Sequence, residues 1–148
     1  MLNHENNVEI LMVEDNPNDE ELALHALKSH NLAGKIEVLH DGEEALDYMF
    51  CTGKFKSRQI KDAPKIILLD IKLPKINGLD VLKKLKEDER TKHIPVVVLT
   101  SSNQEKDIIK SYQLGVNSYI VKPVDYDNFT DTVKQIGQYW LITNESPA

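Results

Sequence analysis

Short runs of branched apolar residues recur along the chain, and a segment of helical period follows each of them. Four runs are clear and one is weaker: 8–13, 65–70, 95–100 and 118–121, with 35–40 as the weaker run. Nearly unbroken apolar strands that alternate with helices are typical of a parallel sheet, because crossover helices cover both of its faces. The crossovers are expected to be right-handed. The pattern therefore predicts an α/β fold with a doubly wound, five-stranded parallel sheet.

The segments that follow these runs place apolar residues on one helical face. The predicted helices cover residues 18–30, 42–50, 78–88, 105–115 and 127–140. In the first of them, acidic residues occupy the first turn, and Lys28 and His30 lie near the end. This charge order complements the helix dipole and supports the prediction.

The length of 148 residues suits one domain with a proper core. We predict a single domain over residues 1–148, with loosely ordered ends at 1–7 and 143–148. The basic insert at 51–64, CTGKFKSRQIKDAP, is longer than an ordinary helix-to-strand connection. It is expected to form a surface elaboration, either with a role of its own or with a short ordered turn. A solvated loop and a partner contact both stay open.

Composition narrows the class of protein. A hydrophobic content of 41% and a charged content of 28% are ordinary for a soluble globular protein. A net charge of −6 with no offsetting basic run argues against a nucleic-acid surface. The single cysteine, Cys51, excludes an intramolecular disulfide and suits a reducing compartment. With no long apolar span and no signal-peptide pattern, we expect a cytoplasmic protein that does not enter a membrane.

Polar residues stand directly after four of the predicted strands. They are Glu14 and Asp15, Asp70, Thr100 and Lys122. In open parallel sheets the functional crevice forms beyond the carboxyl ends of the strands, where the strand order reverses. We therefore expect these side chains to share one crevice.

Three carboxylates in one crevice cannot all be comfortably ionised unless a cation joins them. The predicted ligands, Glu14, Asp15 and Asp70, offer only oxygen atoms. Oxygen ligands favour Mg²⁺ or Mn²⁺ over zinc. Ca²⁺ stays open on these ligands, although no calcium-loop pattern of alternating acids is present. We predict a Mg²⁺ site.

Asp70 is the best candidate for a nucleophile, because a carboxylate can attack phosphorus to give an aspartyl phosphate. The transferred phosphoryl group carries negative charge, so its site needs donors and cations. Thr100 offers a hydroxyl group and Lys122 an ammonium group. Together with a metal ion, these residues would complete a phosphoryl-transfer site.

Each of these residues also has a purely structural explanation. An acid pair after a strand can simply complement a helix dipole. Thr100 could cap a helix that begins near Asn103, and Asp70 could form a turn. Lys122 before Pro123 could mark a plain loop boundary. The coincidence of all of them at four strand ends favours the functional interpretation.

The chain resembles response-regulator receiver domains of two-component signalling over essentially its whole length. The resemblance rests on VEDN at 13–16, LLDIKLPKINGLDVL at 68–82, VVVLTSS at 96–102 and YIVKP at 119–123. It implies the CheY-like, flavodoxin-like (βα)5 fold with strand order 2-1-3-4-5. It also implies a protein that accepts a phosphoryl group from the phosphohistidine of a sensor histidine kinase and switches partner binding.

The resemblance assigns a role to each site residue. Asp70 is the phosphoacceptor, and Glu14, Asp15, Asp70 and the backbone carbonyl of Lys72 are the Mg²⁺ ligands. Thr100 and Lys122 contact the phosphate, and Tyr119 is the switch aromatic that turns inward when Thr100 moves. The Lys122–Pro123 peptide is expected to be cis, at modest energetic cost.

Further details resemble the stand-alone regulators of bacterial phytochrome-type histidine kinases. They are EDNPNDEELALHAL, the basic insert and IGQYWL near the end. This resemblance implies a homodimer through the fourth helix, fifth strand and fifth helix, with the C-terminal extension. Tyr139, Trp140 and Leu141 would suit that contact, or would pack on the domain's own core.

Other functions stay open beside this one. The protein could pass its phosphoryl group onward to a histidine phosphotransfer protein as a phosphorelay intermediate. An aspartate-based phosphatase is disfavoured, because Lys72 occupies the position of the general acid. A flavodoxin-like electron carrier is disfavoured, because Glu14 and Asp15 would repel a flavin phosphate. We therefore expect a phosphoacceptor rather than a turnover enzyme.

Overall fold

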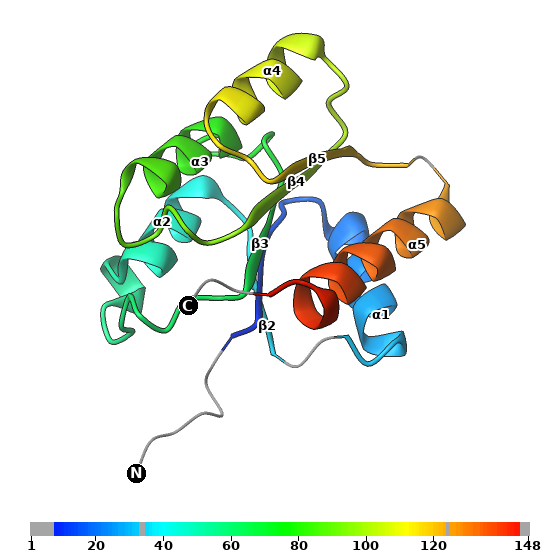
Figure 1. The fold of residues 1–148 in the computed structure, drawn as a ribbon, viewed down its shortest axis with the longest axis horizontal. Coiled ribbons are helices and arrows are strands. Elements are labelled where there is room, and N and C mark those ends of the chain that lie inside the picture. Colours follow the sequence, from blue (N-terminus) through cyan, green and yellow to red (C-terminus); the bar gives the residue numbers. More distant parts are fainter. Residues whose placement is uncertain (1–7, 33–34, 124, 146–148) are drawn as a thin grey trace.

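Five parallel strands form one sheet with helices on both faces (Figure 1). The computed structural model describes residues 8–32, 35–123 and 125–145. The strands are β1 (Ile10–Val13), β2 (Ile36–Leu39), β3 (Ile66–Leu69), β4 (Val96–Thr100) and β5 (Ser118–Val121). Their order is β2-β1-β3-β4-β5. The predicted doubly wound α/β fold and its strand order are confirmed.

Most of the helices begin where the sequence supplies a capping side chain. The α-helices of the described residues are α1 (Pro17–Ser29), α2 (Gly42–Phe50), α3 (Gly78–Glu87), α4 (Glu105–Gln113) and α5 (Tyr126–Gly137). The side chains of Asn16, Asp41, Asn77 and Asp125 accept hydrogen bonds from backbone N–H groups in the first turns of α1, α2, α3 and α5. Because such caps satisfy otherwise unpaired donors, they fix the start of four helices close to the predicted residues.

Alternate strand residues build two cores, one on each face of the sheet. Leu11 and Val13 of β1 belong to the core that contains residues of α2 and α3. Ile10 and Met12 point to the opposite face and join the core of α1 and α5. Figure 1 shows α1 and α5 together on one side of the sheet and α2, α3 and α4 on the other. Strands buried on both faces explain the unbroken apolar runs.

The basic insert at 51–64 folds into an ordered turn, as one of the two alternatives predicted. It contains the short 3-10 helix η2 (Gly53–Phe55). The Arg58 guanidinium lies 3.7 Å from the centre of the Tyr48 ring, and its Nη2 donates to the Asp62 carbonyl oxygen at 2.7 Å. A cation over an aromatic face is attracted to it, so Arg58 fastens the insert to α2.

The C-terminal segment continues α5 as a π-helical turn, η3 (Gln138–Thr143). Thr143, which we predicted to lie in a loosely ordered tail, instead ends this turn. Trp140 and Leu141 pack against the core of α1 and α5, whereas Tyr139 is half exposed. Asn144 follows this turn, and its backbone N–H donates to the Tyr139 carbonyl oxygen at 2.6 Å. Residues 1–7 and 146–148 of the predicted loose ends lie outside the described residues.

The backbone geometry tests the predicted cis peptide bond. No peptide bond among the described residues is cis, so the expected cis Lys122–Pro123 bond is wrong. The free-energy difference between the two isomers is small before proline, which leaves the sequence unable to fix the choice.

Within the described part of the chain, no helix combines the length and the apolar character that crossing a bilayer requires.

Candidate functional site

The carboxyl ends of four adjacent strands bring the predicted site residues to one edge of the sheet. Glu14 follows β1, Asp70 follows β3, Thr100 ends β4 and Lys122 follows β5. Glu14, Asp70 and Thr100 are buried, and Asp15 is exposed. Buried carboxylates need compensating partners, so the contacts of each one decide what the site can do.

Three donors orient the carboxylate of Asp70. Its Oδ1 accepts hydrogen bonds from the Thr100 hydroxyl at 2.7 Å and from the Lys72 backbone N–H at 3.0 Å. Its Oδ2 accepts from Lys122 Nζ at 2.9 Å. The bond to Lys72 is the local turn that the structural explanation of Asp70 requires, and the other two bonds come from residues far along the chain, at the ends of β4 and β5. Turn formation and membership of the site therefore coexist at Asp70.

The ammonium group of Lys122 lies among three carboxylates. Its Nζ is 2.8 Å from Glu14 Oε1, 2.8 Å from Asp19 Oδ2 and 2.9 Å from Asp70 Oδ2. Burial alone would lower the pKa of Lys122, but the hydrogen bonds to Asp19 and Glu14 and the charge of Asp70 raise it above its ordinary value. Lys122 therefore brings a positive charge into the site at neutral pH.

Oxygen atoms of Glu14, Asp15 and Asp70 lie within 4.8 Å of one another. We refer to these three residues as the acid cluster. Burial raises the pKa of Glu14 from 4.5 to about 7, the Lys122 hydrogen bond opposes that rise, and the negative charge of Asp70 adds to it. An acid held in this way gains from a nearby cation. The donor set, made only of oxygens, fits a hard divalent ion.

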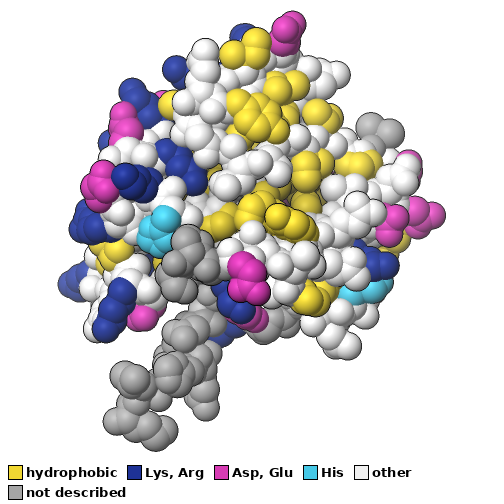
Figure 2. All heavy atoms as spheres, viewed as in Figure 1, with side chains coloured by type: hydrophobic (Ala, Val, Ile, Leu, Met, Phe, Trp, Pro, Cys, Tyr) yellow, Lys and Arg dark blue, Asp and Glu magenta, His cyan; other side chains and the backbone are white. Residues whose placement is uncertain are grey.

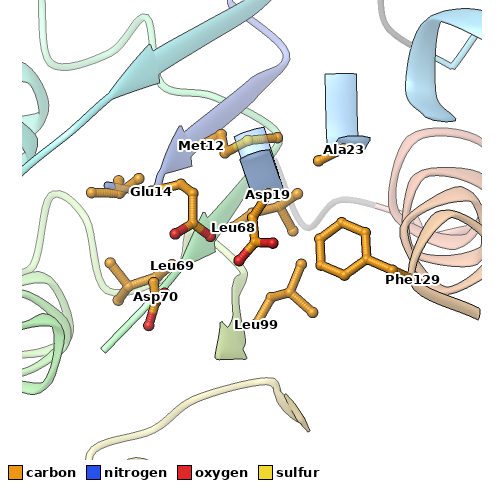
Figure 3. A pocket seen from close by; sticks show the side chains of 10 residues that line it. Met12, Glu14, Asp19, Ala23, Leu68, Leu69, Asp70, Leu99 and Phe129 are labelled. Atoms are coloured by element: carbon orange, nitrogen blue, oxygen red, sulfur yellow. The ribbon is translucent and has the colours of Figure 1, made fainter. Parts of the chain in front are cut away.

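A small pocket lies beside the acid cluster (Figure 3). Glu14, Asp19 and Asp70 line it together with apolar residues that include Leu99 and Phe129. Its volume of about 10 Å³ is close to the room that one water molecule needs.

Asp19 is a member of the site that the sequence analysis missed. It lies in the first turn of α1, where its N–H donates to the capping side chain of Asn16 at 3.1 Å. In the sequence it is one acid among several at a helix start, and such acids usually complement the dipole. Its bond to Lys122 joins residues that are 103 positions apart. Only the fold reveals it.

Thr100 and Tyr119 occupy separate places near the start of α4. Thr100 does not cap α4, whose N-cap residue is Gln104. Tyr119 is partly buried, and its hydroxyl donates to the Ser102 carbonyl oxygen at 2.9 Å. Burial raises the pKa of Tyr119 above its ordinary value. Ser102 thus lies between the residue that contacts Asp70 and the aromatic residue on β5.

Comparison with known proteins agrees with this geometry. Residues 10–134 match the family described as response regulator receiver domain. The probable methanogenesis regulatory protein FilR2 of Methanothrix harundinacea is 41% identical over 138 residues, which are 93% of this chain and 86% of that protein. Response regulator Rcp1 of Synechocystis is 37% identical over 139 residues, covering 94% of this chain and 92% of that protein.

Solved structures extend the match to the fold. The Mn²⁺-bound form of Rcp1 superposes with a TM-score of 0.88 over 95% of this chain and 99% of that one, at 37% identity. The phosphorylated cyanobacterial phytochrome response regulator RcpA gives the same TM-score of 0.88 and the same coverage, 95% and 99%, at 38% identity. The acid cluster at the strand ends, the receiver fold and the family match together show that this chain belongs to the response regulator receiver family of two-component signalling.

Proposed function

We propose that this protein accepts a phosphoryl group on Asp70 with the help of Mg²⁺ and thereby switches the binding of a partner. One observation carries the proposal: Thr100 and Lys122, from two other strands, donate to the two oxygens of the Asp70 carboxylate. Hydroxyl and ammonium donors around a carboxylate suit the charge that develops on a phosphoryl group.

The chemical step is a direct displacement at phosphorus. An oxygen of the Asp70 carboxylate forms a bond to phosphorus while the bond from phosphorus to a kinase histidine nitrogen breaks, and its electron pair stays on that nitrogen. When bound to Glu14, Asp15, Asp70 and the Lys72 carbonyl, Mg²⁺ would neutralise part of the negative charge on the acids and on the phosphoryl oxygens.

The residues of the chain do the rest. Lys122 supplies a fixed positive charge, because its raised pKa keeps it protonated at neutral pH. Thr100 supplies a hydroxyl donor that can move from Asp70 to a new phosphoryl oxygen. The Lys72 N–H holds the reacting carboxylate in place at 3.0 Å from Oδ1. Positioning and electrostatics of this kind account for most of phosphoryl-transfer catalysis.

Labelling with acetyl phosphate tests the proposal. We expect one phosphoryl group per chain in the presence of Mg²⁺ and almost none after the metal is chelated. The incorporated label is measured by mass spectrometry of the intact protein. Equal labelling with and without Mg²⁺ would contradict the proposed role of the acid cluster.

Asp15→Ala is expected to weaken Mg²⁺ binding about 100-fold, because it removes an oxygen ligand from the acid cluster. Asp15 is exposed, so its loss should leave the buried bonds of Lys122 in place. Titration calorimetry with MgCl₂ measures the effect. Asp131→Ala removes an exposed acid from α5 and is the matched control. Equal Mg²⁺ affinity in the two variants would remove Asp15 from the site.

The switch would run from Thr100 to Tyr119. When Thr100 turns to a phosphoryl oxygen, it vacates space, and we propose that Tyr119 gives up its bond to the Ser102 carbonyl and turns inward. The resulting change on β5 and α4 would bias partner binding by a few kcal/mol, about the usual size of coupling between sites.

Thr100→Val is expected to separate phosphorylation from this switch, because valine keeps the shape of threonine but has no hydroxyl to follow the phosphoryl group. The variant should still take label on Asp70, at a reduced rate. The NMR signals of the Tyr119 ring should change on phosphorylation of the wild-type protein and stay unchanged in the variant. If the Tyr119 ring signals change on phosphorylation in the variant as much as in the wild-type protein, the hydroxyl of Thr100 does not drive the movement of Tyr119.

The proposed phosphodonor is a sensor histidine kinase of the phytochrome type. Support comes from the likeness to RcpA, which is described as a phytochrome response regulator, at 38% identity over 95% of this chain. Phosphotransfer from a phytochrome-type kinase and from a histidine kinase with an unrelated sensor, under equal conditions, tests the choice. Faster transfer from the unrelated kinase would refute it.

We also propose a homodimer through the α4, β5 and α5 face. Half-exposed apolar side chains on these elements are Ile109, Tyr112, Val121 and Tyr126. Figure 2 shows hydrophobic side chains gathered across the face below α4. The contact would extend to Tyr139, whereas Trp140 and Leu141 serve the chain's own core. Size-exclusion chromatography before and after phosphorylation tests the assembly.

A phosphorelay is the alternative to direct partner binding. A phosphorelay role, in which Asp70 passes its phosphoryl group to a histidine phosphotransfer protein, uses the same site and is the second candidate. Transfer of label to such a protein would distinguish it from direct partner binding.

Cys51 is a free thiol, which supports the cytoplasm as the proposed location.

A further inference from the structure

Asp19 contacts the Lys122 ammonium group at 2.8 Å, and the proposed phosphoryl transfer assigns Asp19 no part. We propose that Asp19 is a positioning residue that fixes this ammonium beside Asp70 while the acid cluster is occupied by metal and phosphoryl group. The inference rests on the proposed function, because it concerns the same transfer to Asp70.

The ammonium group of Lys122 has three N–H donors and three carboxylate partners. The partners are Glu14 and Asp19, each at 2.8 Å, and Asp70 at 2.9 Å. The side chain of Lys122 is 8% exposed, so water has little access to replace any of them. Because charge-assisted bonds of this length are strong, all three partners determine where the amine lies.

The three partners differ in what else they do. Glu14 and Asp70 belong to the acid cluster. Among the residues that the structure describes, Asp19 is not a member of that cluster. A cation at the cluster would draw on the carboxylates of Glu14 and Asp70, and phosphorylation converts Asp70 itself. Of the three carboxylate contacts of Lys122, the bond to Asp19 is therefore the one that neither metal binding nor phosphorylation removes.

Asp19 is also the better fixed of the two bonded residues. Its backbone N–H is bonded to the capping side chain of Asn16, and its helix, α1, packs against α5. Lys122, by contrast, follows the edge strand β5, whose residues are only partly buried or exposed. A lysine side chain is long and flexible, so its tip is placed by what it contacts. In this site the contact that endures comes from α1.

Two substitutions separate the charge of Asp19 from its shape. Asp19→Ala removes the acceptor, and Asp19→Asn keeps an oxygen without the full charge. With saturating Mg²⁺ we expect the maximal rate of acetyl phosphate labelling to fall about tenfold in Asp19→Ala and about threefold in Asp19→Asn, because a misplaced group loses its effect on the reacting centre. The Mg²⁺ dissociation constant should stay within about twofold of the wild-type value.

Glu20→Gln is the matched control. It removes one negative charge from the same turn of α1, but Glu20 Oε1 is bonded to His40 Nε2, at 2.9 Å, and not to Lys122. A helix-dipole effect would slow this control as much as Asp19→Asn. We expect the control to label at the wild-type rate.

An NMR measurement tests the positioning without phosphorylation. The ¹⁵N signal of the Lys122 ammonium, assigned by its loss in Lys122→Arg, should be visible in wild-type protein with and without Mg²⁺. In Asp19→Ala it should disappear into fast exchange when Mg²⁺ is added. A signal that persists in Asp19→Ala with Mg²⁺ would overturn the inference.

The labelling outcomes are equally decisive. An unchanged rate in Asp19→Ala, on a wild-type protein that labels normally, would overturn the role of Asp19 and leave the proposed function intact. A fall in Mg²⁺ affinity as large as the fall in rate would make Asp19 a metal ligand instead. Absence of label on the wild-type protein would overturn the proposed function and with it any role of Asp19 in transfer.

Discussion

Asp70→Asn is expected to abolish labelling by acetyl phosphate or by a cognate kinase, a loss of about 1000-fold or more. The amide is not a nucleophile at phosphorus, so the substitution removes the bond-forming atom, together with the negative charge that Lys122 Nζ contacts at 2.9 Å. Asparagine keeps the shape of aspartate and an oxygen that can accept from Thr100 and from the Lys72 N–H. The measurement is the incorporated phosphate per chain in the presence of Mg²⁺.

A folded protein is the necessary control for this loss. The thermal unfolding of Asp70→Asn should stay close to that of the wild-type protein or rise above it, because the substitution removes one charge from a crowded acid cluster. Label that persists at the wild-type level in a folded Asp70→Asn variant would place the phosphoacceptor elsewhere in the chain.

Gly78→Ala is expected to lower the free energy of unfolding by about 3 kcal/mol or more. A Cβ atom at Gly78 would lie 2.3 Å from the Asp70 carbonyl oxygen and 2.4 Å from the Ile71 Cα. Both are backbone atoms, so the start of α3 or the loop after β3 has to shift. The same backbone carries Asp70, and labelling should fall as well. Urea unfolding measures the stability.

Gly137→Ala is the matched comparison. There the added Cβ would meet Leu27 Cδ2 at 2.8 Å, the end of a side chain that can rotate. The cost should be smaller, about 1 kcal/mol, and labelling should stay normal, because the clash is in the core of α1 and α5. Equal destabilisation by the two substitutions would show that the close backbone approach at Gly78 is not special.

The fold and the main site residues could be predicted from the sequence because both are encoded locally. A strand buried on both faces must be apolar, and runs such as 66–69 leave few alternatives. The carboxyl ends of parallel strands share one edge, so the residues after them share one crevice. Glu14, Asp15 and Asp70 were therefore foreseen together, and the structure brings their oxygens within 4.8 Å of one another.

The rest depends on distances that no local pattern encodes. Asp19 joins Lys122 across 103 positions, and an acid in a first helical turn looks the same whether or not it reaches a lysine. The close contact at Gly78 arises from the packing of α3 on the loop after β3. The trans Lys122–Pro123 bond reflects a small energy difference that the surroundings decide.

The most direct test maps the phosphorylated residue itself. The wild-type protein is labelled with acetyl phosphate and Mg²⁺ and reduced with borohydride, which converts an aspartyl phosphate to homoserine, and its peptides are sequenced by mass spectrometry. Our account predicts homoserine at position 70 alone. Homoserine at another position, or a phosphate that survives on a serine, threonine or histidine, would contradict it.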